Sequence, residues 1–154
     1  MLLYLVRHGE AKREEEDPER GLTDNGLRSA RRMGEFLSFM DVSLDVIIHS
    51  TKKRAAQTAE AFTESLRLVT GLTEEKGLSP NDDPAPWVAR ANAMTKDTAI
   101  VGHRPFLDRL LGLLVLGDAG KTIIDFKTAG TVCLKPAGDG KWVIAWVLSP
   151  EVIW

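Results

Sequence analysis

The feature that most constrains the fold is an alternation of short apolar runs with longer segments of helical periodicity. The apolar runs at residues 2–6, 46–48 and 98–101 contain no turn residues and predict buried strands. Segments in which apolar residues recur every three or four positions follow these runs. Such alternation is typical of an α/β domain with a largely parallel sheet. We therefore expect a single three-layer α/β/α domain over residues 1–154 with a mostly parallel central sheet.

Capping and turn residues mark the limits of the remaining elements. Thr23 can cap the first helix, and Pro105 suits the first turn of a leucine-rich helix that we expect to be buried and to end at Gly117. The charged segment 12–20 and the Pro- and Asp-rich segment 77–86 predict loops. Two final strands, at residues 131–134 and 142–148, flank Gly138-Asp139-Gly140, and this Asp-Gly step predicts an antiparallel hairpin at the C-terminal end of the sheet.

Charge and cysteine content exclude several classes of protein. The chain has 20 basic and 22 acidic side chains and a net charge of -2, which gives no general attraction for nucleic acid or for an anionic membrane. Cys133 is the single cysteine, so an internal disulfide is excluded and a reducing compartment is favoured. The N-terminal residues lack a basic leader, and no apolar run reaches the length of a membrane span. We expect a cytoplasmic monomer that binds neither nucleic acid nor membranes.

Polar residues follow each of the three predicted parallel strands. The first strand ends in Arg7-His8-Gly9, the second leads through His49-Ser50 to Arg54, and the third ends in Gly102-His103. In open α/β sheets ligands bind beyond the carboxyl ends of the strands, so these groups are expected at one crevice. A neutral imidazole can attack phosphorus, and guanidinium groups match phosphate oxygens. Phosphoryl transfer mainly needs such positive donors, so Arg7, His8, Arg54 and His103 are the candidate catalytic and phosphate-binding residues, with no metal required.

Four motifs in order resemble those of the histidine phosphatase superfamily, also called the phosphoglycerate mutase-like family. They are Arg7-His8-Gly9-Glu10, residues 22–26 (LTDNG), residues 50–60 (STKKRAAQTAE) and Val101-Gly102-His103. The resemblance covers nearly the whole chain. The short length and the segment 78–83 (LSPNDD) are most similar to the SixA-type phosphohistidine phosphatases.

The resemblance implies a role for each of the four candidates. According to the resemblance, His8 becomes transiently phosphorylated and Arg7 and Arg54 hold the phosphoryl oxygens. His103 acts as a donor to the transferring group. It further implies that no cofactor or metal takes part.

Two departures from the family pattern are visible. Thr51 stands where many relatives have proline, and the extra strand-end histidine, His49, is assigned a structural or peripheral role. Ester-cleaving relatives carry a mid-chain glutamate that protonates the leaving oxygen, and none can be placed here from the sequence. The carboxylates considered for this role are Glu10, Glu74, Glu75, Asp82 and Asp83. The loop 12–20 is interpreted as a solvated segment, with a lid over the site as the alternative.

The lack of an evident general acid in the sequence affects which substrate is expected. General acid catalysis strongly assists the departure of an alkoxide, whereas the nitrogen of a P–N bond can be protonated by water or a weak acid. The leading hypothesis is therefore a phosphohistidine phosphatase that acts on a phosphorylated protein. A phosphatase for a small phosphate ester or metabolite and a non-catalytic phosphate-binding module are the alternatives. A metal hydrolase that uses His8, His49, His103 and Glu10 ranks lowest, because their spacing is not that of a zinc motif and the adjacent arginines repel a cation.

Overall fold

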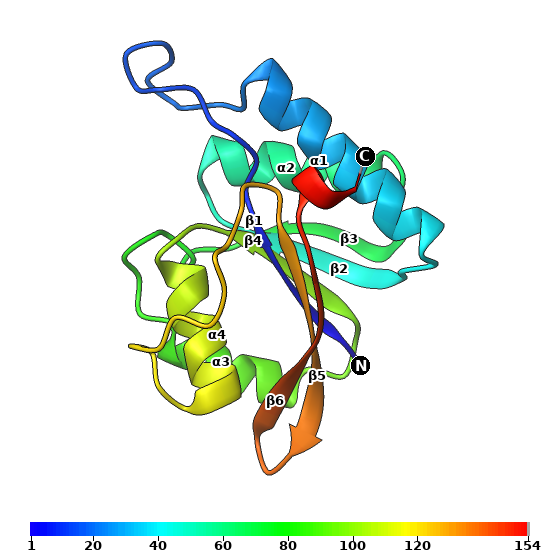
Figure 1. Ribbon diagram of the computed structural model, residues 1–154, viewed down its shortest axis with the longest axis vertical. Helices are drawn as coiled ribbons and strands as arrows, with labels where there is room; N and C mark the ends of the chain where they lie inside the picture. Colours follow the sequence, from blue (N-terminus) through cyan, green and yellow to red (C-terminus); the bar gives the residue numbers. More distant parts are fainter. Residues whose placement is uncertain (154) are drawn as a thin grey trace.

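A computed structural model describes residues 1–153 and shows a six-stranded sheet flanked by helices (Figure 1). Trp154, the last residue of the predicted domain, lies outside the described residues. The elements follow the chain as β1 (Leu3–Arg7), α1 (Asp24–Phe39), β2 (Leu44–His49), α2 (Lys53–Thr63), β3 (Leu68–Glu74), α3 (Ala85–Ala93), β4 (Thr98–Gly102), α4 (Phe106–Leu116), β5 (Thr131–Gly138), β6 (Lys141–Leu148) and the short 3₁₀ helix η1 (Pro150–Val152).

The sheet has the strand order β3-β2-β4-β1-β5-β6. Strands β3, β2, β4 and β1 are parallel to one another, whereas β5 is antiparallel to β1 and β6 is antiparallel to β5. The predicted mostly parallel sheet with a C-terminal antiparallel hairpin is therefore confirmed. Because β1, β4 and β2 are neighbours and parallel, their carboxyl ends lie side by side at one edge of the sheet.

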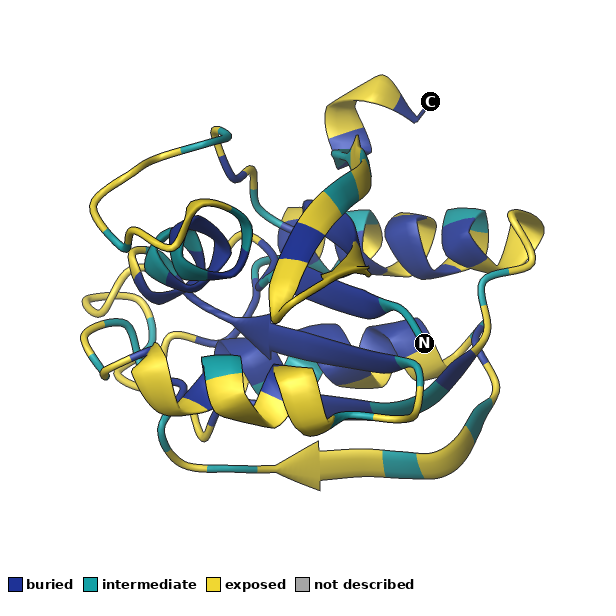
Figure 2. Cartoon of the chain, turned by 90° about the horizontal axis from the view of Figure 1, so that it is seen from below, coloured by how far each residue is buried: buried dark blue, intermediate teal, exposed yellow. Residues whose placement is uncertain are grey.

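Two separate apolar cores fill the space on the two faces of the sheet. Along β1 the side chains alternate between the cores, as the pleat of a strand requires: Leu3 and Leu5 pack with α3 and α4, and Tyr4 and Val6 pack with α1 and α2. Figure 2 shows the buried strands between helices whose outer surfaces are exposed. The expected three layers are present.

The predicted cap at Thr23, the helix end at Gly117 and the hairpin turn are found at the expected residues, whereas Pro105 precedes the first turn of α4 as its N-cap. The Thr23 hydroxyl accepts the Gly26 N–H at 2.9 Å and begins α1. Gly117 ends α4 with a φ of 69°, and the hairpin turns at Asp139 and Gly140 with φ of 55° and 71°. These positive values are the left-handed conformations that such turns need. The burial of α4 is less complete than expected, because Leu116 at its end is 59% exposed.

Strand β3 was not predicted from the sequence. It forms the edge of the sheet beyond β2, and most of its residues are exposed. Gly71 interrupts it with a φ of 104°, next to an irregularity in the β2–β3 register. An exposed strand carries neither a continuous apolar run nor a clean alternation, so the usual sequence signal is missing. Among residues 1–153 no helix combines the length and the apolar character needed to cross a membrane.

Candidate active site

The strand register brings the predicted site residues to the same edge of the sheet. Arg7 lies opposite Gly102 in the β1–β4 pair, and His49 lies opposite Val101 in the β2–β4 pair. The residues that follow continue these contacts, since the His8 N–H donates to the Gly102 carbonyl at 3.0 Å. The rings of His8 and His103 consequently lie with their centroids 5.0 Å apart.

His8 is held in one protonation state by its surroundings. Its Nδ1 lies 2.7 Å from the Gly9 carbonyl oxygen, which can only accept, so Nδ1 carries the proton. Burial, with the positive charges of Arg54 and Arg7 acting in the same direction, lowers the pKa of His8 to about 4. At neutral pH the ring is therefore uncharged and Nε2 carries a free lone pair. This is the form that a nucleophile needs.

His103 is almost fully buried and contacts a hydroxyl group. Its Nε2 lies 2.6 Å from Ser50 Oγ, while its Nδ1 is buried and has no hydrogen-bond partner among the described residues. Burial lowers the pKa of His103 to about 3, and the nearby positive charge of Arg54 acts in the same direction. The ring is thus a neutral imidazole with one nitrogen unengaged.

The two predicted arginines approach the site from different elements. Arg7, at the end of β1, donates from Nη1 to the Phe126 carbonyl at 2.7 Å, and Arg54 lies in the first turn of α2. The Nε of each is buried without a partner within residues 1–153. Burial lowers the pKa of both guanidinium groups, although each remains charged at neutral pH. Buried guanidinium groups with unused donors are suited to an anion.

A threonine that the sequence analysis missed links the His8 loop to α2. Thr58 is fully buried; its hydroxyl accepts the Gly9 N–H at 2.9 Å and donates to the Arg54 carbonyl at 2.8 Å. The same loop presses against the start of α1, where a Cβ on Gly26 would lie 2.1 Å from the Glu10 carbonyl oxygen. The loop after His8 is therefore fixed on both sides.

A hollow of about 700 Å³ opens beside Arg54. The loop 12–20 forms its wall, and Arg20, Lys52 and Glu74 line it together with Arg54. Hydrogen bonding from the Lys12 N–H to the Gly21 carbonyl at 2.9 Å closes the base of the loop. The loop is solvated along residues 14–16, as expected, yet it also contributes Arg20 to this hollow, which the sequence analysis did not foresee.

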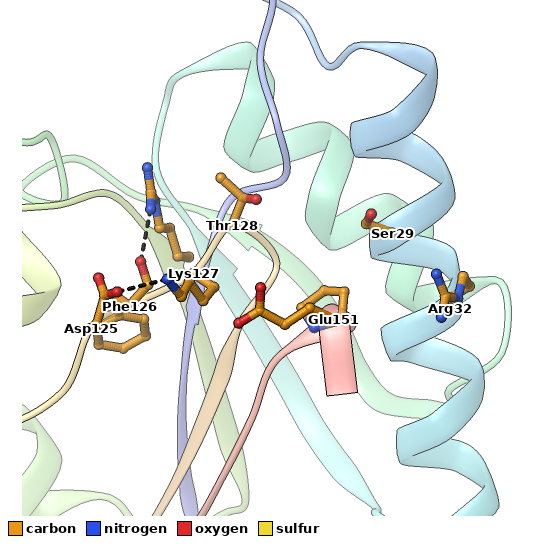
Figure 3. A pocket seen from close by; sticks show the side chains of 9 residues that line it. Ser29, Arg32, Asp125, Phe126, Lys127, Thr128 and Glu151 are labelled. Atoms are coloured by element: carbon orange, nitrogen blue, oxygen red, sulfur yellow. Dashed lines mark hydrogen bonds and ion pairs between the residues drawn. The ribbon is translucent and has the colours of Figure 1, made fainter. Parts of the chain in front are cut away.

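A second cavity of about 390 Å³ lies on the Arg7 side, between the segment 125–128, α1 and η1 (Figure 3). Arg32 and Lys127 bring positive charge to it, and Lys127 is paired with Asp125 at 2.7 Å. The two cavities thus reach the candidate site at its two arginines, one at Arg54 and the other at Arg7.

Most of the carboxylates considered as a proton donor are engaged elsewhere. The two oxygens of Glu10 accept from Thr23 and Asn25 at the start of α1, at 2.8 and 3.3 Å. Asp82 accepts from a backbone N–H within its own turn, and Asp83 does so at the start of α3. Of the two glutamates at the end of β3, Glu75 is paired with Arg90 at 2.9 Å, and Glu74 lines the hollow beside Arg54.

His49 does not join the two other histidines in a ligand cluster. Its Nδ1 lies 3.0 Å from the Ser50 carbonyl oxygen, a local contact that fits a structural role. Within residues 1–153 there is no group of three or more His, Cys, Asp or Glu side chains placed to hold a metal ion.

Comparison with known proteins matches this architecture to one family. Residues 3–79 match the model of the histidine phosphatase superfamily (branch 1). The chain is 26% identical over 155 residues to phosphohistidine phosphatase SixA of Escherichia coli (strain K12), covering 97% of this chain and 94% of that protein.

Solved structures give the same result. The structure of SixA complexed with tungstate superimposes with a TM-score of 0.88 at 26% identity, covering 98% of both chains. A phosphoserine phosphatase from Entamoeba histolytica shares the fold alone, with a TM-score of 0.71 at 16% identity over 96% of both chains. The family match and the similarity to SixA support a phosphatase activity. The chain belongs to the histidine phosphatase superfamily.

Proposed function

We propose that the protein is a metal-independent phosphohistidine phosphatase that works through a phosphoenzyme at His8. The observation that carries the proposal is the state of His8: a neutral ring whose Nδ1–H is engaged with Gly9 and whose Nε2 is unprotonated, close to the guanidinium groups of Arg7 and Arg54 and to the ring of His103. Localised positive donors around a phosphoryl group are what lowers the barrier to phosphoryl transfer.

The reaction takes place in two steps. In the first, the His8 Nε2 lone pair attacks phosphorus, the P–N bond of the substrate breaks, and its electron pair stays on the substrate imidazole, which leaves with a proton from solvent. In the second, water attacks the phosphorus of phospho-His8, giving inorganic phosphate and returning the lone pair to Nε2. Arg7 and Arg54 offset the negative charge of the oxygens in both steps.

Two structural observations and one comparison favour a P–N bond carried on a protein. The carboxylates of Glu10, Asp82 and Asp83 are tied into caps and turns, so they are poorly placed to protonate an alkoxide. The hollow beside Arg54 has a volume of about 700 Å³, which is enough to receive a side chain from another molecule. Similarity to SixA over nearly the full length of both chains points in the same direction.

One observation favours the second candidate, a phosphatase for a small phosphate ester. Glu74 lies at the end of β3 and lines the same hollow as Arg54, so it is the candidate acid best placed to meet a leaving oxygen. If esters are the substrates, Glu74→Gln lowers ester hydrolysis by the 10²- to 10⁴-fold, roughly, that general acids contribute. If phosphohistidine is the substrate, the same change leaves dephosphorylation nearly unaltered.

The test compares a ³²P-labelled histidine-phosphorylated protein with a simple aryl or alkyl phosphate ester. We expect rapid loss of label from the protein, a phosphoenzyme in the wild type that is absent in His8→Ala, and no effect of a chelator. His49→Ala is the matched control, because it removes another buried strand-end histidine, whose ring makes one hydrogen-bond contact within residues 1–153, to the adjacent Ser50 carbonyl. A strong preference for the ester, or equal labelling of His8→Ala, would overturn the proposal.

A further inference from the structure

The contact between Ser50 and His103 carries information about the proton on His103. Ser50 is fully buried at the end of β2, and its Oγ lies 2.6 Å from His103 Nε2. The same oxygen accepts the Lys52 N–H at 3.2 Å. Within residues 1–153, His103 Nε2 is the one acceptor that the Ser50 hydroxyl contacts.

The two neutral tautomers of His103 differ in how many buried groups they leave unsatisfied. If Nε2 carried the proton and donated to Ser50, the serine hydroxyl hydrogen would be buried without an acceptor, and the Nδ1 lone pair would be buried without a donor. If Nδ1 carries the proton, the Ser50 hydroxyl donates to Nε2, and the Nδ1–H is then the one group left without a hydrogen-bond partner among the described residues. Each unsatisfied buried polar group is costly, so the second arrangement is favoured.

The unpaired Nδ1–H of His103 can donate a hydrogen bond to a phosphoryl oxygen. An Nδ1–H is a donor, whereas an Nδ1 lone pair would repel the oxygens that the nearby arginines attract. His103 is next to His8, with ring centroids 5.0 Å apart. An imidazole that must donate while uncharged depends on a partner for its other nitrogen.

We propose that Ser50 is a positioning residue that holds His103 in the tautomer with its proton on Nδ1, so that Nδ1–H meets the phosphoryl group transferred at His8. This inference rests on the proposed function for its consequence in catalysis. The tautomer itself is a property of the free protein. The two parts are therefore tested separately.

The first experiment reads the tautomer directly. Long-range ¹H–¹⁵N correlation spectra of ¹⁵N-labelled protein at neutral pH distinguish protonated from unprotonated ring nitrogens, and a His103→Gln variant assigns the His103 signals. We expect Nδ1–H in the wild type, and in Ser50→Ala a mixture of tautomers or Nε2–H. An Nε2–H tautomer in the wild type overturns the inference whether or not any variant folds.

The second experiment measures the rate of His8 phosphorylation. In Ser50→Ala we expect a fall of about 10- to 100-fold with little change in KM, less than the 10²- to 10³-fold cost of removing a transition-state donor outright. Ser50→Thr, which keeps the hydroxyl, restores the rate. Thr98→Val is the matched control, because it removes a buried hydroxyl whose one partner among the described residues is the Lys96 carbonyl, at 2.8 Å.

The outcomes separate the two proposals. A wild-type rate in Ser50→Ala, or an equal loss in Thr98→Val, overturns the role of Ser50. Absence of a phosphoenzyme in the wild type overturns the proposed function instead, and the tautomer in the spectra still decides the state of His103.

Discussion

Replacing Gly26 with alanine should displace the loop that carries the predicted nucleophile. An ideal Cβ at Gly26 lies 2.1 Å from the Glu10 carbonyl oxygen, and ordinary contact begins at 3.4 Å, so the loop must retreat by about 1.3 Å. Glu10 follows His8 by two residues, and its carbonyl also accepts the Thr23 N–H at 3.0 Å. A misplacement of about 1 Å can cost roughly 10²-fold in rate, so we expect His8 phosphorylation to slow by about that factor.

Stability should change much less than rate. Alanine in place of a helical glycine gains about 1 kcal/mol of helix propensity, and overpacking costs about 1–3 kcal/mol, so the two effects partly cancel in Gly26→Ala. For a chain of this size each 1 kcal/mol moves the Tm by roughly 2–4 °C. A melting curve followed by circular dichroism therefore shows whether the protein is still folded under the conditions of the rate measurement.

Gly34→Ala provides the control in the same helix. Its Cβ would lie 3.1 Å from the Phe62 Cα, so it tightens the contact between α1 and α2 at a distance from the His8 loop. We expect this variant to phosphorylate His8 within about threefold of the wild type, a difference of less than 1 kcal/mol in the barrier. If folded Gly26→Ala is as fast as Gly34→Ala, the loop does not depend on the close approach of the α1 start, and the reasoning is refuted.

Three further results are expected. The free energy of unfolding should fall as the pH is lowered from about 6.5, where unfolded histidine titrates, towards 4. His8 and His103 have lowered pKa values in the folded state, so in this range the unfolded chain binds protons that the folded chain does not bind. Urea titrations of His8→Gln and His103→Gln should show a shallower fall. Arg7→Lys should lower kcat/KM by about 10²-fold, because an ammonium cannot both bind the Phe126 carbonyl and grip phosphate with a planar fork; wild-type kinetics would contradict this. Glu10→Gln should keep its activity in steady-state assays, because its carboxylate binds the start of α1, and a large loss would reassign it to catalysis.

The positions of the four candidate site residues could be expected from the sequence because they depend on a general property of parallel sheets. Arg7 ends a buried strand with a clear apolar run and His8 follows it, His103 follows a second such strand, and Arg54 lies one loop beyond a third. Groups placed in this way meet whenever their strands are neighbours. The adjacency of β1, β4 and β2 in the sheet supplied that condition.

Other parts of the site have no comparable signal. Ser50 and Thr58 are small hydroxyl residues whose partners lie 53 and 49 positions away, so their contacts depend on strand and helix packing that no local pattern encodes. Arg20 belongs to a charged segment in which every side chain is an equally good candidate for solvent. Glu10 sits beside the predicted nucleophile in sequence, yet the start of α1 binds its carboxylate.

The position of β1 in the sheet sets the order in which the site can be made. The ribosome produces β1 before the other five strands, and its two lateral neighbours, β4 and β5, begin only at Thr98 and Thr131. Pairings between segments so distant in sequence form late in folding, because the loop entropy must be overcome first. A nascent chain or a proteolytic fragment that stops before β5 leaves the strand of His8 with an open edge. We therefore expect the proposed phosphoryl transfer only after β5 has been synthesised, and a chain that ends before Thr131 to be inactive.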